Sequence, residues 1–137
     1  MASELLLDTG AFVALVNGSE RRHAECVAAL NDWTGAIVTT EAVVTETLHL
    51  LGARWRAQDA CLQFLRRRAF LLAPSTPAVI ERVAVLMEKY QDVPMDYAGA
   101  TLVALGEELE TDAVFTLDRR GFSAYRLKGR KAFRMIP

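Results

Sequence analysis

The chain has 137 residues, of which 52% are hydrophobic and 24% are charged, and its formal net charge is −1. This length predicts one domain with a buried core, and the composition excludes a disordered or fibrous chain. No apolar window approaches the length of a membrane-spanning helix and the N-terminus does not resemble a signal peptide, so we expect a single cytoplasmic domain over residues 1–137.

Short apolar runs alternate with helical patterns in the first half of the chain. Residues 4–7 predict a strand, and residues 11–33 repeat apolar residues at three- and four-residue steps, which predicts two helices broken near the sequence Asn-Gly-Ser-Glu. Residues 36–40 predict a second strand, and residues 41–55 predict a helix with Thr40 as its N-cap.

The second half of the chain continues this alternation. Residues 56–68 predict an amphipathic helix and residues 69–74 a third strand. The strongest helix signal covers residues 76–92, where Thr76 is the expected N-cap and Pro77 occupies the first helical position. The remaining expected elements are a helix over residues 97–109, a strand over 113–117 and a last strand over 132–137.

Strands that alternate with helices of about ten to fifteen residues need crossover connections, which favour a mainly parallel sheet covered on both faces. We therefore expect an α/β fold with its functional side chains at the carboxyl ends of the strands. Asp8 and Asp118 follow the first and fourth predicted strands, and Glu46 lies about a turn and a half into the helix after the second strand. These three carboxylates should meet at one edge of the sheet.

Several carboxylates at one sheet edge repel each other, and a buried carboxylate without a positive partner is unfavourable. Mg²⁺ or Mn²⁺ would neutralise them, because these hard cations take oxygen ligands and keep bound waters. A bound ion can lower the pKa of water and direct it at a phosphorus atom, so the pattern indicates phosphodiester hydrolysis. The hydroxyls of Thr9 and Thr116 could orient such a water or one of the acids.

Four segments of the chain together resemble a known family. They are LLLDTGAFVALVNGSERRH, TTEAVVTETLHLL, DYAGATLVALGEEL and VFTLDRRGFSAYR, and they cover nearly the whole chain in the right order. The set is similar to PIN domains, and specifically to the VapC-type toxins of bacterial toxin–antitoxin pairs. This resemblance implies a three-layer α/β/α sandwich and a metal-dependent endoribonuclease. It also implies an RNA substrate, an inhibiting cognate antitoxin and a homodimer.

The resemblance also assigns site residues. Asp8 matches the family's first acid, Glu46 the second and Asp118 the fourth. The third acid is normally an Asp followed by Ala in the helix before the last core strand, and Gly99 occupies that position here. Asp96 lies three residues earlier and near the same helix face, so it could take the place of the missing acid. The alternative is a catalytically impaired PIN domain that only binds RNA or the antitoxin.

Each aspartate also has a structural alternative. Asp8 could cap the helix that follows it, and Asp118 could form a turn with the Arg-Arg-Gly sequence after it. Asp96 follows a proline and could be an N-cap whose carboxylate accepts the amide of Gly99. The triplet Asp-Thr-Gly also occurs in aspartic proteases, but these are all-β proteins, and the helical periodicity disfavours that class. A phosphatase with two aspartates after the first strand is disfavoured because Gly10 stands where the second would be.

The C-terminal segment is basic. From Arg119 to the end it contains seven Lys and Arg residues and no acidic residue. For a nuclease, the expected RNA phosphate contacts are Arg119, Arg120, Arg126 and Lys128. The alternative is a solvated edge strand and turn whose charges discourage aggregation.

Overall fold

Five parallel strands form the central sheet of the computed structural model, which describes residues 3–137. Their order across the sheet is β3 (Leu71–Ala73), β2 (Ile37–Thr40), β1 (Leu5–Leu7), β4 (Ala113–Phe115) and β7 (Arg134–Ile136). A separate antiparallel pair is formed by β5 (Arg126–Leu127) and β6 (Lys131–Ala132).

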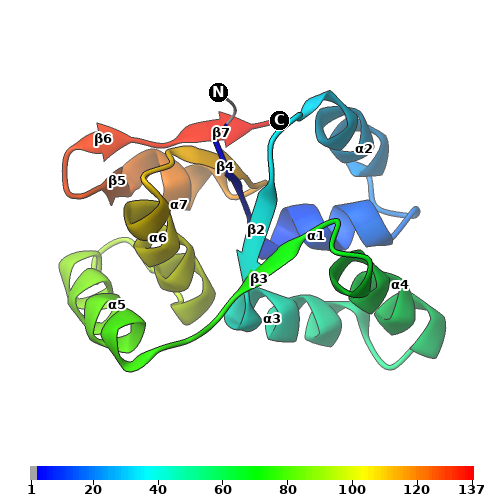
Figure 1. Ribbon diagram of the computed structural model, residues 1–137, viewed down its shortest axis with the longest axis horizontal. Helices are drawn as coiled ribbons and strands as arrows, with labels where there is room; N and C mark the ends of the chain where they lie inside the picture. Colours follow the sequence, from blue (N-terminus) through cyan, green and yellow to red (C-terminus); the bar gives the residue numbers. More distant parts are fainter. Residues whose placement is uncertain (1–2) are drawn as a thin grey trace.

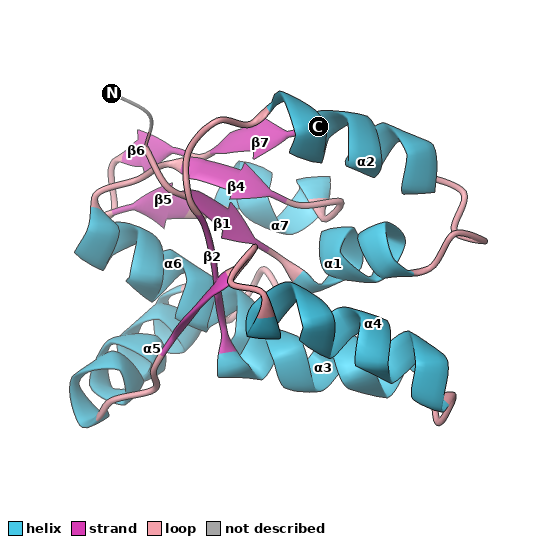
Figure 2. Ribbon diagram, turned by 45° about the vertical axis from the view of Figure 1, so that its right-hand side comes forward, coloured by secondary structure: helices cyan, strands magenta, loops and turns pink. Residues whose placement is uncertain are grey.

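Helices cover both faces of this sheet, with α5, α6 and α7 on one side and α1, α2 and α4 on the other (Figures 1 and 2). Helix α3 starts at the carboxyl end of β2 and packs against α1, α4 and α6. The expected α/β/α architecture with a mainly parallel sheet is therefore confirmed. No helix among residues 3–137 is both long and apolar enough to cross a membrane. The helices are α1 (Thr9–Val16), α2 (His23–Asp32), α3 (Glu41–Leu51), α4 (Trp55–Arg66), α5 (Pro77–Lys89), α6 (Tyr97–Leu109) and α7 (Arg119–Ala124).

The central strands are apolar on both faces because helices cover both faces. All residues of β1 and β4 are buried. On the side of α1 and α4, Phe12 and Phe70 pack edge to face with ring centroids 5.2 Å apart, and Phe64 stacks on Phe70 at 4.7 Å. Buried on both faces, β1 gives the residue that follows it, Asp8, a fixed position at the carboxyl edge of the sheet.

Two predicted helix caps are present in the structure. The Thr40 hydroxyl accepts the Val43 amide at 3.3 Å, and the Thr76 hydroxyl accepts the Val79 amide at 3.2 Å. Pro77 is the first residue of α5, as its fixed φ and missing N–H favour. The caps therefore set where α3 and α5 begin.

The differences from the predicted elements lie at a helix end and in the C-terminal segment. The helix expected over residues 41–55 ends at Leu51, because Gly52 adopts a left-handed backbone conformation with φ of 78°. Residues 119–132, expected as a basic tail, instead form α7 and the β5–β6 pair. Strand β7 lies at the edge of the sheet, and an edge strand in this part of the chain is what the alternative to RNA contacts predicted.

Helix α6 lies against the sheet at a glycine. A Cβ atom at Gly106 would lie 3.0 Å from the Leu6 side chain and 3.0 Å from the backbone oxygen of Thr111. Both neighbours belong to the rigid core, so a side chain at this position cannot be accommodated by a surface movement.

We expect Gly106→Val to lower the free energy of unfolding by about 1–3 kcal/mol, because the added atoms overpack this contact. The measurement is urea unfolding followed by circular dichroism. The matched control is Gly18→Val, since a Cβ atom at Gly18 has no neighbour within 4 Å. An equal loss in both variants would contradict the close approach of α6 to β1.

Candidate functional site

A cleft of about 190 Å³ opens at the carboxyl edge of the sheet. Asp8 enters it from the end of β1, Glu46 from α3, and Asp96 and Asp118 from the residues that precede α6 and α7. Gly99 also lines this cleft. The structure thus brings together all four carboxylates singled out in the sequence, around the position where the resemblance expects a further acid.

Asp8 is the buried member of this group, with 9% of its surface exposed. Its Oδ1 accepts the Thr9 amide at 2.8 Å, and its Oδ2 accepts the Thr116 hydroxyl at 2.7 Å. The Thr116 Oγ1 atom in turn accepts the Asp118 amide at 2.9 Å. One hydroxyl therefore connects the ends of the neighbouring strands β1 and β4 and orients Asp8.

The environment of Asp8 disfavours its charged form. Burial raises the pKa of Asp8 to about 6, hydrogen bonds from Thr116 and Thr9 oppose this shift, and the negative charges of Asp96 and Asp118 add to it. None of the described residues that line the cleft is Lys, Arg or His. A cation in the cleft would remove this unfavourable interaction.

Asp96 and Asp118 are helix caps as well as cleft residues. The Asp96 Oδ1 atom accepts the Gly99 amide at 2.7 Å, as the sequence predicts for an N-cap, and the Asp118 Oδ1 atom accepts the Gly121 amide at 3.0 Å. Within residues 3–137, the second oxygen of each carboxylate has no hydrogen-bond donor. The cap therefore orients the side chain and leaves one oxygen available to a ligand.

Both capping aspartates are followed at the third helical position by a glycine. A Cβ atom at Gly99 would lie 3.0 Å from Asp96 Oδ1, and a Cβ atom at Gly121 would collide with the Asp118 carboxylate. These glycines give the capping carboxylates room. The repeated Asp-x-x-Gly spacing is the sequence signal for this arrangement, and it marks Gly121 as the residue that leaves room for the Asp118 carboxylate.

Tyr125 is a cleft residue that the sequence did not reveal. Its ring lies 4.0 Å from the Cβ position of Gly99, and its hydroxyl donates to the Pro94 carbonyl at 3.4 Å. Burial, together with the negative charges of Asp118, Asp96 and Asp8, raises its pKa to about 12, so the phenol stays neutral. No local pattern signals this role, because Tyr125 reaches the cleft only through tertiary packing.

The donors in the cleft fit a hydrated hard cation. Within residues 3–137, no group of three or more His, Cys, Asp or Glu side chains is arranged to hold a metal ion directly, so an ion in the cleft would need water molecules among its ligands. Mg²⁺ commonly uses one or two carboxylates and keeps several waters, which matches an open cleft with four carboxylates. Thr9 also lines the cleft, and its Oγ1 atom is buried without a hydrogen-bond partner among the described residues.

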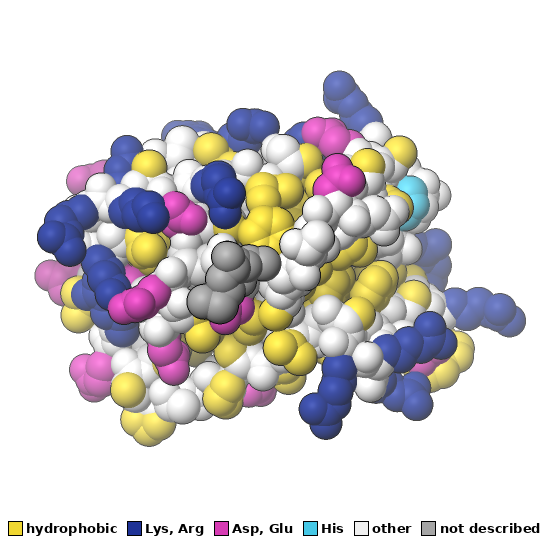
Figure 3. All heavy atoms as spheres, turned by 45° about the horizontal axis from the view of Figure 1, so that its top comes forward, with side chains coloured by type: hydrophobic (Ala, Val, Ile, Leu, Met, Phe, Trp, Pro, Cys, Tyr) yellow, Lys and Arg dark blue, Asp and Glu magenta, His cyan; other side chains and the backbone are white. Residues whose placement is uncertain are grey.

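The four expected RNA contacts occupy different surroundings. Arg120 lines a hollow that adjoins the cleft. Arg119 and Arg126 donate to backbone carbonyl groups, and Lys128 pairs with Glu110 at 3.6 Å. Figure 3 shows Lys and Arg side chains interspersed with acidic ones at the end of the molecule where β5 and β6 lie. Arg120 is therefore the best placed of the four to meet a phosphate near the carboxylates.

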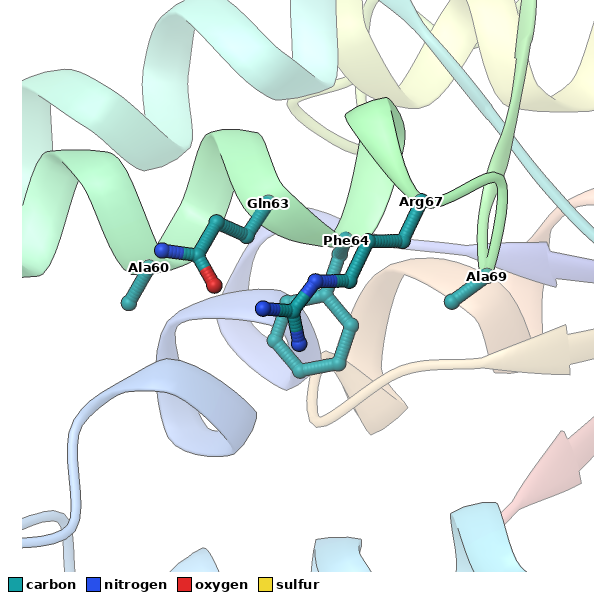
Figure 4. A pocket seen from close by; sticks show the side chains of 5 residues that line it. All are labelled: Ala60, Gln63, Phe64, Arg67 and Ala69. Carbon is teal, nitrogen blue, oxygen red and sulfur yellow. The ribbon is translucent and has the colours of Figure 1, made fainter.

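Another hollow, of about 300 Å³, lies on α4 and the turn after it. Figure 4 shows its lining, which includes the Phe64 ring, the Gln63 amide and the Arg67 guanidinium group. It contains no carboxylate, so it offers no ligand set for a hard cation.

Three comparisons relate the chain to known proteins. The family model described as PIN domain matches residues 5–128. Ribonuclease VapC26 from Mycobacterium tuberculosis is 35% identical over 135 residues, which cover 97% of this chain and 100% of that protein.

Two solved structures share the fold. The crystal structure of Mycobacterium tuberculosis VapC20, described as a Sarcin-Ricin loop cleaving toxin, has a TM-score of 0.77 and 20% identity, covering 83% of this chain and 89% of its own. A toxin–antitoxin complex from Klebsiella pneumoniae has a TM-score of 0.68 and 18% identity, covering 88% of this chain and 91% of its own.

The raised pKa of Asp8 predicts a specific pH dependence of stability in EDTA. Between pH 4 and 6 folded Asp8 keeps a proton that the unfolded chain releases, so the contribution of Asp8 to the free energy of unfolding falls as the pH rises through this window. The Asp8→Asn variant lacks this titration. We therefore expect the free energy of unfolding of the variant, measured relative to that of the wild type, to increase by on the order of 2 kcal/mol from pH 4 to pH 7.

Urea unfolding at several pH values measures this difference. Asp92→Asn is the control, because Asp92 is exposed and does not line the cleft. If the curves for wild type and Asp8→Asn run parallel from pH 4 to 7, the proposed destabilisation of the Asp8 carboxylate is wrong.

Proposed function

The chain belongs to the PIN domain family, and from that premise we propose that it is an endoribonuclease, dependent on Mg²⁺ or Mn²⁺, that hydrolyses RNA phosphodiester bonds. The observation that carries this proposal is the group of four carboxylates in one cleft that has no basic side chain in its described lining. The full-length similarity to a protein named ribonuclease VapC26 supports the RNA substrate and the role of a toxin.

We assign the metal-binding role, directly or through bound waters, to Asp8, Glu46 and Asp118, with Asp96 contributing from the N-cap of α6. When bound, Mg²⁺ or Mn²⁺ supplies an activated water and offsets the negative charge that develops on the phosphate. Thr116 holds Asp8 in place, and the helix caps hold Asp96 and Asp118. Because the Asp8 pKa is raised, loading the cleft with a cation should release a proton at about pH 6.

Gly99 supports an alternative, in which the chain is a weakened or inactive PIN domain that binds RNA or an antitoxin. Position 99 carries no carboxylate, and no three or more His, Cys, Asp or Glu side chains within residues 3–137 are arranged to hold a metal ion directly. We favour the active enzyme, because Asp96 lines the same cleft and has one oxygen without a protein donor. The two functions make opposite predictions for the native chain.

The proposal extends to partners and setting. The toxin–antitoxin complex among the structural relatives supports a cognate antitoxin as the binding partner. A homodimer, a cytoplasmic location and one functional unit over residues 1–137 follow from the family resemblance and composition. We propose Arg120 as a phosphate contact, because it lines the hollow beside the cleft, with Arg119, Arg126 and Lys128 as weaker candidates.

The activity can be measured on a mixed pool of short RNAs with protein that has been stripped with EDTA and then supplied with Mn²⁺. We expect cleavage by the native chain and a loss of roughly 100-fold or more in Asp8→Asn and Glu46→Gln, since each substitution removes a ligand oxygen with its charge. Thr116→Val should lose roughly 10–100-fold, because it removes only the group that orients Asp8. Asp92→Asn should cleave like the native chain.

The Gly99→Asp variant separates the enzyme from the binding module in the same assay. If the native chain and Gly99→Asp both cleave RNA, the carboxylates of Asp8, Glu46, Asp118 and Asp96 are sufficient for cleavage without an acid at position 99. Cleavage by Gly99→Asp alone would establish the alternative, an impaired domain. If Gly99→Asp is folded by circular dichroism but neither gains activity nor binds Mn²⁺ more tightly by calorimetry, an acid at position 99 does not complete this site, where its Cβ atom would lie 3.0 Å from Asp96 Oδ1.

A further inference from the structure

A groove of about 500 Å³ adjoins the carboxylate cleft on the side of α3. Its walls come from α3 and from the first turn of α6. Glu46 and Asp96 line both the groove and the cleft, so the two hollows adjoin at these carboxylates. A chain that crosses the carboxylates can therefore enter this groove without leaving the surface.

The groove contains an exposed aromatic side chain. Tyr97 is the first residue of α6, directly after Asp96, and 42% of its surface is exposed. Within residues 3–137 its ring stacks on no other aromatic ring and its hydroxyl forms no hydrogen bond with protein. A single exposed aromatic residue is common on protein surfaces, so it is the position of Tyr97 beside the carboxylates that indicates a ligand.

The other groove residues match a flat and uncharged ligand. Ala42 and Ala98 provide small apolar surfaces, and Thr45 and His49 provide polar atoms. The Thr45 hydroxyl donates to the Glu41 carbonyl at 3.0 Å, so its oxygen remains able to accept a hydrogen bond. His49 is exposed and can donate or accept at its ring nitrogens. A nucleobase has this combination of an apolar face and a polar edge.

Charge distinguishes the two ends of the cleft. A phosphate in the groove would be repelled by Glu46 and Asp96, whereas a neutral base would not. The hollow that contains Arg120 adjoins the cleft through Pro94 and Asp118, and this end suits a phosphate. An RNA strand can therefore place a phosphate near Arg120, the scissile bond at the carboxylates and a base in the groove.

We propose that the Tyr97 groove binds one unstacked nucleobase of the RNA, next to the phosphodiester that the carboxylates receive. This inference rests on the proposed nuclease function and adds a specificity-determining subsite to it. Proteins that read single-stranded RNA stack exposed bases on aromatic rings and contact their edges with polar groups. Tyr97 supplies the stacking surface, and Thr45 and His49 distinguish one base edge from another.

The test uses the full chain and short pyrimidine RNAs that each carry a single 2-aminopurine, whose fluorescence falls when it stacks on an aromatic ring. Binding is measured with Ca²⁺ in place of Mn²⁺, after a gel has shown that the RNA remains intact. We expect quenching by the native chain, and in Tyr97→Ala a loss of the quenching and a rise in Kd of about 5- to 100-fold. Tyr97→Phe keeps the ring and should bind within about twofold of the native chain.

The control is Trp55→Ala, because Trp55 is also an exposed aromatic residue, at 68%, but lines neither the cleft nor the groove. Circular dichroism checks that each variant is folded. The proposal is overturned if Tyr97→Ala binds and quenches like the native chain, or if Tyr97→Phe loses as much as Tyr97→Ala. It is also overturned if Tyr97→Ala weakens only the complex with an antitoxin.

The Mn²⁺ cleavage assay separates this proposal from the nuclease proposal. Quenching that depends on Tyr97 without any cleavage supports the subsite and contradicts the nuclease. Cleavage with unchanged kcat/KM and Kd in Tyr97→Ala contradicts the subsite and supports the nuclease. A native chain that binds no RNA contradicts both.

Discussion

The burial of the Asp8 carboxylate at the carboxyl edge of the sheet, beside other carboxylates, is the constraint on which the candidate site depends. Asp8 is fixed at the end of a fully buried strand, so it cannot turn away from Asp96 and Asp118. Burial and the two neighbouring charges both favour protonation of Asp8. The packed core must stabilise this arrangement when no cation is bound. Carboxyl groups whose pKa is shifted by burial and by neighbouring charges cluster at functional sites, which agrees with the proposed role of this cleft.

The capping hydrogen bonds explain how two of these carboxylates combine a structural and a proposed chemical role. Asp96 and Asp118 each use one oxygen to begin a helix, and the glycine three residues later leaves room for the carboxylate. The alternatives of helix cap and ligand are therefore compatible. Gly99 has a local structural reason of its own, which is the space beside Asp96. A chain without an acid at position 99 can thus keep the geometry of the cleft.

The sequence predicted the parts of the fold that depend on local patterns. The buried strand before Asp8 and the helix begun by Thr76 follow from apolar periodicity and capping residues, and both are present. Helix α7 and the β5–β6 pair were not predicted, because six-residue helices and two-residue strands are too short to show a period. The ion pair of Lys128 could not be predicted either, because its partner Glu110 lies at the end of α6 and the two residues meet only in the folded chain.

The residues of the candidate site also fall into those that sequence patterns predict and those that only tertiary packing brings into place. Asp8, Glu46 and Asp118 could be found from their places relative to predicted strands, whereas Tyr125 and the Tyr97 groove depend on how α3, α6 and α7 pack.

The central claim is that this carboxylate cleft binds a divalent cation although position 99 is glycine. Anomalous diffraction from crystals soaked in Mn²⁺ tests it most directly. The account predicts an anomalous peak in the cleft that is lined by Asp8, Glu46, Asp96 and Asp118. An empty cleft at Mn²⁺ concentrations that saturate binding in solution would contradict it.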